Sequence, residues 1–168
     1  MTKQRHIIHL TVILSLLTLY GCPEITRYSE IPQITYLSHS IKDSTNQLGN
    51  DQKFLVLTFD VIDGDGDIGL SPADTVAPYD SIFQYNFFPT LLVKKDGLWD
   101  TSNVNENETN YRIPYIEVEN HKAYKAEIDV EFQFFDATLP GDTVKYEFYI
   151  LDRAFHKSNV EITPEIVF

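Results

Sequence analysis

Two stretches in the last third of the chain alternate apolar and polar residues. In residues 126–134 every even position is apolar and every odd position is acidic or an amide, and residues 144–150 largely repeat the pattern. A period of two is that of a β-strand with one buried and one solvated face. We therefore expect two such strands, with Asp129 on the wet face and the following side chains in the core: Ile128, Val130, Phe132, Tyr146 and Phe148.

Residues 54–61 form a third strong strand pattern. Leu55, Leu57 and Phe59 fall on one face, and Phe54 and Val56 on the other face are also apolar. Two apolar faces indicate a strand in the middle of a sheet. Near the C-terminus a weaker alternation predicts a further strand with Val160 and Ile162 buried, which Pro164 confines to a sheet edge.

The remaining patterns predict short strands and turns. We expect a first strand around residues 34–38, a polar loop over 42–52, strands over 82–88 and 91–95, and a two-residue hairpin turn at Asp96-Gly97. The chain after the first 21 residues has no convincing helical period. About seven short strands predict an all-β fold, an antiparallel β-sandwich of the immunoglobulin or fibronectin type III kind, with a small barrel as the alternative.

The N-terminus carries an export signal. Lys3 and Arg5 precede an apolar run over residues 7–19, which is the layout of a signal peptide. The following Leu19-Tyr20-Gly21-Cys22 resembles the lipobox of bacterial lipoproteins, which implies that Cys22 becomes the first residue and carries lipid, including acyl chains such as palmitate. The chain has 1 Cys, so an internal disulfide cannot form. We expect a signal peptide over 1–21, a tether over 22–32 and one domain over 33–168.

The net charge of the chain limits the kinds of partner that it can bind. There are 13 basic and 25 acidic residues among 168, a net charge of −12 at pH 7. Such an excess of carboxylates argues against nucleic acid or an anionic membrane surface as a partner, and it favours solubility and the binding of cations.

An acidic loop follows the central strand. Asp63, Asp65 and Asp67 alternate with glycines in Asp63-Gly64-Asp65-Gly66-Asp67, so three carboxylates fold toward one point. Carboxylate oxygens are the ligands of Ca²⁺, which predicts a calcium site with Asp60 or Asp74 as further ligands. The spacing fits an EF-hand imperfectly, because Ile68 stands where that loop needs glycine. The alternative is an Asp-Gly turn whose carboxylates accept backbone N–H groups.

No catalytic constellation is visible. His39, His121 and His156 lack metal-ligand spacing, and no Gly-x-Ser-x-Gly elbow occurs. Trp99, just after the hairpin turn, is the best candidate for stacking on a sugar. We therefore expect a protein that is not an enzyme.

Further motifs carry a resemblance to a known family. They are the acidic loop Asp63–Leu70, the segment Tyr111-Arg112-Ile113-Pro114, Asp152-Arg153-Ala154, Ser158-Asn159 and Thr163. With them the chain resembles small Bacteroidetes lipoproteins that have one immunoglobulin-like domain behind a lipobox. Phe155-His156 replaces the Gly-Asn usual after the Asp-Arg-Ala triplet.

The resemblance implies a location in the bacterial cell envelope, held by lipid and facing either side of the outer membrane. The expected function is a membrane-anchored binding or structural module for an unknown protein or glycan, stabilised by Ca²⁺. The alternative is a carbohydrate-binding accessory lipoprotein of a glycan-uptake system.

Overall fold

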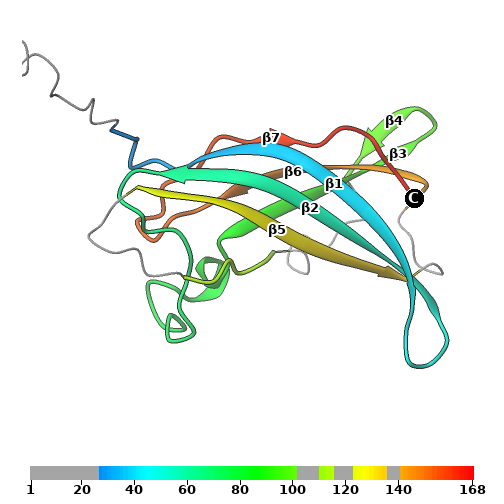
Figure 1. Cartoon of the computed structure of the whole chain (residues 1–168), viewed down its shortest axis with the longest axis horizontal. Coiled ribbons are helices and arrows are strands. Elements are labelled where there is room, and N and C mark those ends of the chain that lie inside the picture. The colour runs from blue at the N-terminus through cyan, green and yellow to red at the C-terminus, as the bar shows by residue number, and fades with distance from the viewer. Residues whose placement is uncertain (1–26, 102–109, 116–122, 136–140) are drawn as a thin grey trace, which may run out of the picture.

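The chain folds into two packed antiparallel sheets (Figure 1). The computed structural model describes residues 27–101, 110–115, 123–135 and 141–168. The predicted signal peptide, Cys22 and most of the tether lie outside these residues. Within them, no helix is both long and apolar enough to cross a membrane. The all-β sandwich predicted from the alternating patterns is confirmed.

The first sheet has the order β1-β2-β5, made of β1 (Gln33–Thr45), β2 (Asp51–Asp63) and β5 (Tyr124–Phe135). β2 lies in the middle, as its two apolar faces predicted. Leu55, Leu57 and Phe59 are fully buried, and Phe54 and Val56 on the opposite face are half-buried. On β5, Val130 and Phe132 are buried and Asp129 is exposed, which confirms the predicted orientation of that strand.

The predicted polar loop over residues 42–52 is wrong. β1 continues to Thr45 and pairs with β2 in register, with Lys42 opposite Phe54 and Thr45 opposite Asp51. The polar residues are compatible with a strand because they occupy the solvated part of a long hairpin. Only residues 46–50 form the loop, which Asn46 closes by accepting the N–H groups of Leu48 and Asn50 on its Oδ1.

The second sheet has the order β4-β3-β6-β7, with β8 also paired to β6. Its strands are β3 (Phe87–Lys95), β4 (Leu98–Asp100), β6 (Thr143–Ile150), β7 (Glu161–Ile162) and β8 (Ile166–Val167). Asp96 and Gly97 form the two-residue turn between β3 and β4, with φ of 51° and 81°. Positive φ at both central residues is the type I′ geometry that Asp-Gly predicted.

The predicted strand over residues 82–88 is wrong in its first half. Residues Ser81–Gln84 form a 3₁₀ turn, η1, and Phe83 is 41% exposed. Pairing with β6 begins only at Phe87, opposite Ile150, where β6 ends. Residues before Phe87 therefore have no neighbouring strand to extend against.

The burial of Val160 and Ile162, predicted from the C-terminal alternation, is also wrong. Val160 is 47% and Ile162 is 52% exposed, so neither belongs to the core. Thr163 is buried instead, because its Oγ1 accepts the N–H of Tyr146 and its own N–H donates to the Tyr146 carbonyl. This pair of bonds turns Thr163 inward and its neighbours outward. Ile166, farther along, is buried.

Aromatic rings fill the space between the sheets. Phe59 of β2 stacks on Phe87 of β3 with ring centroids 5.5 Å apart, and both contact Phe148 of β6. Phe132 of β5 stacks on Tyr146 at 4.4 Å. Rings from both sheets thus form one continuous core, which fixes how the sheet ends, and the loops on them, face each other.

One open side of the sandwich is closed by side chains. Asn159 accepts the N–H of Ile34 on its Oδ1 and donates from Nδ2 to the carbonyl of the same residue. Glu161 accepts the N–H of Tyr36 in the same way. The amide of Asn159 therefore takes the place of a strand beside the start of β1.

Candidate metal centre

The acidic loop and a second loop meet at one end of the sandwich. β2 ends at Asp63 beside the start of β5, and β6 ends at Ile150 beside the start of β3. The loops after β2 and β6 come from different sheets and lie side by side (Figure 1). Backbone hydrogen bonds join them, since the N–H of Arg153 donates to the carbonyl of Asp67 at 3.2 Å.

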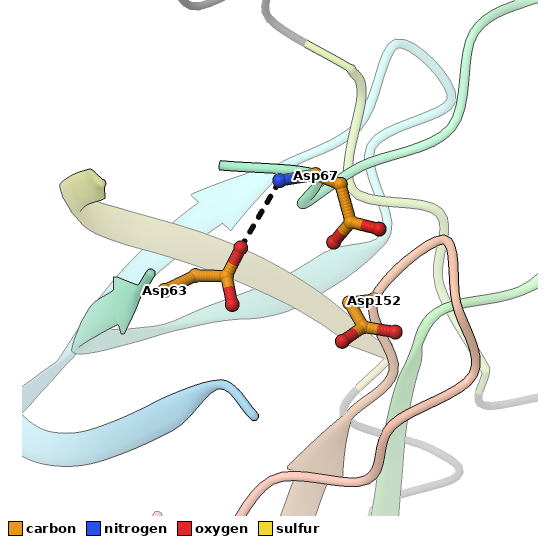
Figure 2. Close-up of side chains that lie close together, drawn as sticks. All are labelled: Asp63, Asp67 and Asp152. Carbon is orange, nitrogen blue, oxygen red and sulfur yellow. Dashed lines mark hydrogen bonds between the residues drawn. The ribbon is translucent and has the colours of Figure 1, made fainter. Parts of the chain in front are cut away.

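Three carboxylates converge where these loops meet. Asp63 closes β2, Asp67 lies in the acidic loop and Asp152 follows β6, and each offers an oxygen within 4.8 Å of the others. Figure 2 shows the three side chains turned toward a common point. Asp63 is 0% and Asp152 is 3% exposed, and Asp67 is half-buried. The site joins both sheets through buried, negatively charged groups.

Asp63 uses its two oxygens differently. Oδ2 accepts the N–H groups of Gly66 and Asp67, each at 3.0 Å, and so shapes the loop. The interpretation of the loop as an Asp-Gly turn is confirmed for this oxygen. Oδ1 is buried and has no hydrogen-bond partner among the described residues, and the same holds for Oδ1 of Asp65 and of Asp67. Unpaired buried oxygens are costly and need a partner such as an ion.

The electrostatics agree with that geometry. Burial raises the pKa of Asp63 to about 7, and the charges of Asp65 and Asp67 add to the rise. Burial also raises the pKa of Asp67 to about 6, helped by repulsion from Asp152 and Asp65. In the part of the chain described, no Lys or Arg forms an ion pair with Asp63 or Asp67. A divalent cation would relieve this repulsion.

Asp152 was not among the predicted ligands. Its Oδ1 accepts the N–H of His156 at 2.7 Å and its Oδ2 lies 2.9 Å from His156 Nδ1. The hydrogen bond to Asp152 raises the pKa of His156. Burial raises the pKa of Asp152. Only the Asp152-Arg153-Ala154 motif pointed to this residue, because it lies 85 positions beyond Asp67 in the sequence and nothing local marks it.

The other predicted ligands are not among the three converging carboxylates. Asp65 is near the cluster and raises the pKa of Asp63, but it is not one of the three residues whose oxygens converge. Asp74 is engaged by Arg153 through two hydrogen bonds, of 2.5 and 3.2 Å, and the bond to Arg153 holds the pKa of Asp74 well below its usual range. Asp60 is exposed on β2, directly opposite Glu127 of β5.

Trp99, the predicted sugar-stacking residue, is half-buried on β4. The ammonium groups of Lys94 and Lys145 lie 5.6 and 4.6 Å from the centroid of its ring. Cations over an aromatic face interact favourably with it. Trp99 therefore takes part in contacts within the sheet, and its contact with a glycan stays a prediction.

Buried polar groups brace the loops around the cluster. Asn86, 2% exposed, accepts the N–H of Ile113 at 2.6 Å and donates to its carbonyl at 3.2 Å. Arg112 donates to the carbonyls of Ser71, at 2.5 Å, and Asp74, at 2.8 Å. Ser158 accepts the N–H of Ile150 on its hydroxyl. Most of the motifs that carried the family resemblance thus hold this end of the sandwich together.

The acidic loop also holds the segment that leads to the N-terminus. The N–H of Gly64 donates to the carbonyl of Ser29 at 2.7 Å, and a Cβ on Gly64 would lie 2.5 Å from that oxygen. Lys125 places its ammonium 4.2 Å from the ring centroid of Tyr28. The close approach requires glycine at position 64 and fixes where the chain enters the domain.

Comparisons of the chain with protein-family models, with curated proteins and with solved structures each returned no match, so the site is interpreted from its own geometry.

Proposed function

We propose that this protein is a lipid-anchored module of the bacterial cell envelope whose β-sandwich is stabilised by Ca²⁺ at Asp63, Asp67 and Asp152. The observation that carries the proposal is the convergence of three carboxylates from both sheets, of which Asp63 and Asp67 each have a buried Oδ1 without a hydrogen-bond partner among the residues that the structure describes. Without a cation, this arrangement places like charges together in a poorly solvated place.

The donor set favours calcium among common cations. The three residues offer only carboxylate oxygens, which are hard ligands, and the described cluster contains no thiolate or imidazole. Ca²⁺ accepts 6 to 8 oxygens in flexible geometry, so backbone carbonyls or water complete its shell. A site of this kind in an exported module typically binds with a Kd of about 10⁻⁴ to 10⁻³ M.

The ion would connect the two sheets. Asp63 and Asp67 belong to the loop that leaves the first sheet, and Asp152 belongs to the loop that leaves the second. A cation bound by both loops opposes the separation of the sheets at this end. The function that follows is a rigid binding or structural module with no catalytic role, whose end loops are held for contact with another molecule.

The anchor is the second part of the proposal. The apolar run over residues 7–19 and the Leu19-Tyr20-Gly21-Cys22 sequence support export and lipid attachment at Cys22. Several acyl chains hold a protein on a membrane where one does not. In membrane fractionation, we expect the wild type to sediment with membranes and Cys22→Ala to be released. Retention of the variant on membranes would contradict the anchor.

Thermal unfolding tests the calcium site. The protein, purified in mild detergent, is unfolded in excess EDTA and again in several millimolar CaCl₂. A ligand at about ten times its Kd stabilises the folded state by about 1.4 kcal/mol, which raises the Tm by a few degrees. We expect this rise in the wild type and its loss in Asp152→Asn.

Asp129→Asn is the matched control, because Asp129 is an exposed carboxylate on β5 opposite Thr58, five residues along β2 from Asp63, and is not one of the converging carboxylates. It should keep the full calcium-dependent rise. An unchanged Tm of the wild type in calcium, or equal rises in Asp152→Asn and Asp129→Asn, would leave the cluster as an uncompensated acidic turn.

A further inference from the structure

We propose that the end of the sandwich that holds the aspartate cluster faces the bilayer, and that apolar side chains of the loop between β2 and β3 rest on the lipid surface. The proposal rests on the anchor at Cys22. It adds an orientation and a contact surface, which the anchor alone does not determine, since a long tether would leave the domain free to turn.

The entry of the chain limits the distance to the membrane. Ser29 is hydrogen-bonded to Gly64 and Tyr28 lies under Lys125, so the domain begins at that point. Only 6 residue steps separate Tyr28 from Cys22 in the sequence. At 3.3–3.6 Å per residue they span at most about 22 Å. The lipid must therefore lie near the end that contains Gly64, not near the opposite end.

The same end exposes large apolar side chains. The loop that follows the acidic loop presents Val76, 71% exposed, with Ile82 and Phe83 at 42% and 41%, and Tyr115 nearby is 39% exposed. This loop extends from the cluster end in Figure 1, in green at the lower left. The opposite end also exposes apolar side chains, Leu48 at 87% and Leu98 at 74%. The short tether, together with the exposed apolar residues, therefore selects the cluster end as the contact surface.

The apolar side chains of the cluster end are carried on a braced loop. Arg153 binds Asp74, and its guanidinium carbon lies 4.9 Å from the ring centroid of Tyr79. The ring of Phe83 packs on Phe155 with centroids 4.8 Å apart. Because the loop is already ordered, contact with lipid costs little conformational entropy. The anchor also holds the surface at a high local concentration beside the bilayer.

Lipid is the occupant that the geometry favours over a protein or a glycan. The surface carries apolar and aromatic side chains of the kind that settle at the boundary of a bilayer. Because the exposed carboxylate of Asp80 and the aspartate cluster lie beside them, the lipid that fits is zwitterionic, not anionic. The short tether brings it to a membrane whether or not any partner is present. A protein or glycan partner would have to enter between this end and the bilayer.

Tryptophan quenching by brominated phospholipid tests the orientation. The chain has 1 Trp, Trp99, on the strand after the Asp96-Gly97 turn. That turn is separated from Phe87 by the length of β3, about 26 Å at 3.3 Å per residue. Trp99 is thus a built-in reporter of the opposite end. In a Trp99→Phe background, Phe83→Trp and Val76→Trp report the cluster end.

The lipidated proteins are reconstituted into phosphatidylcholine vesicles with and without brominated acyl chains, in millimolar CaCl₂. We expect strong quenching and a blue shift for tryptophan at positions 83 and 76, and no quenching of Trp99 in the wild type. Each variant must unfold within a few degrees of the wild type. Position 76, the more exposed of the two, keeps the test valid if substitution at position 83 disturbs the contact with Phe155.

Three outcomes would overturn the proposal. Quenching of Trp99 alone would place the opposite end on the lipid, and equal quenching everywhere would mean that the domain lies on its side. If a protein that floats with the vesicles shows no quenching at any position, the apolar loop does not touch lipid and is a surface for a protein or a glycan instead. Failure to float would remove the anchor as well. The calcium site is judged separately, because its melting experiment contains no vesicles.

Discussion

The two ends of this sandwich are built by different means. At one end the chain turns through residues 46–50 and through Asp96-Gly97, where Asn46 and positive φ angles complete each turn locally. At the other end, long loops depend on bonds between distant residues, such as Asn86 with Ile113 and the N–H of Arg153 with the carbonyl of Asp67. A local turn needs only its own residues, whereas the cluster end is stable only when several segments are assembled together.

Among the substitutions, removal of a side-chain amide should show the largest difference between the two ends in the free energy of unfolding that is lost. Asn86→Ala leaves the buried N–H of Ile113 without its acceptor and opens a cavity, so we expect a loss of about 2 to 4 kcal/mol. Asn46→Ala, at the hairpin end, removes bonds from an exposed side chain and should cost at most about 1 kcal/mol. Urea unfolding of both variants measures the contrast. Similar losses would mean that the cluster end depends no more on bonds between distant residues than the hairpin end does.

The pH dependence of stability should depend on the cluster end alone. An Asp whose folded pKa lies above its unfolded value stabilises the fold at low pH, and this contribution is lost as pH rises through the folded pKa. With Asp63 at about 7 and Asp67 at about 6, against 3.8 as the ordinary value, stability in EDTA should fall as the pH rises from about 4 to about 7. We expect a loss on the order of 4 kcal/mol from the buried Asp63, and a smaller one from the half-buried Asp67, whose charge is screened by solvent.

Two other groups at the cluster end, Asp152 and His156, have raised pKa values and also lose their contributions as pH rises. Asp74, with a lowered pKa, loses its contribution only in acid. Urea unfolding of Asp63→Asn isolates the cluster, because the variant should lose most of the slope while His156 remains. CaCl₂ should also flatten the wild-type slope, since the ion binds the charged form. A wild-type slope that persists in Asp63→Asn would point to His156.

The smallest expected contrast concerns two glycines. Gly64→Ala forces a Cβ against the backbone of Tyr28 and Ser29, so the segment before β1 must move, at a cost of about 1 to 2 kcal/mol. Gly49→Ala meets no neighbouring atom and pays only for its φ of 82°, about 1 kcal/mol. Limited proteolysis distinguishes them, because only Gly64→Ala should speed cleavage near Ser29. Equal protection would show that the entry segment is not held by the acidic loop.

Much of the sandwich could be predicted, and the reasons are local. β2, β5 and the Asp96-Gly97 turn were found because the side-chain period and the turn chemistry act within a few residues. The strand predicted over residues 82–88 was wrong in its first half because β6, its neighbour, ends opposite Phe87. Val160 was wrongly placed in the core because burial near it depends on the bonds between Thr163 and Tyr146. Asp63 and Asp67 were found from their spacing. Asp152 could not be found that way, because only the packing of two sheets brings it to them.

The amide of Asn159 beside β1 also bears on association between copies of the protein. A strand at the edge of a sheet invites another chain to add to it, because its N–H and C=O groups form a template. Asn159 occupies both groups of Ile34, and Glu161 takes the N–H of Tyr36. Farther along β1, exposed Lys42 and Asp43 place charges on the strand. In the first half of this edge, side chains already occupy the backbone hydrogen-bonding groups, and in the second half charged side chains oppose pairing. Both features should prevent edge-to-edge pairing between copies that are anchored close together on a membrane.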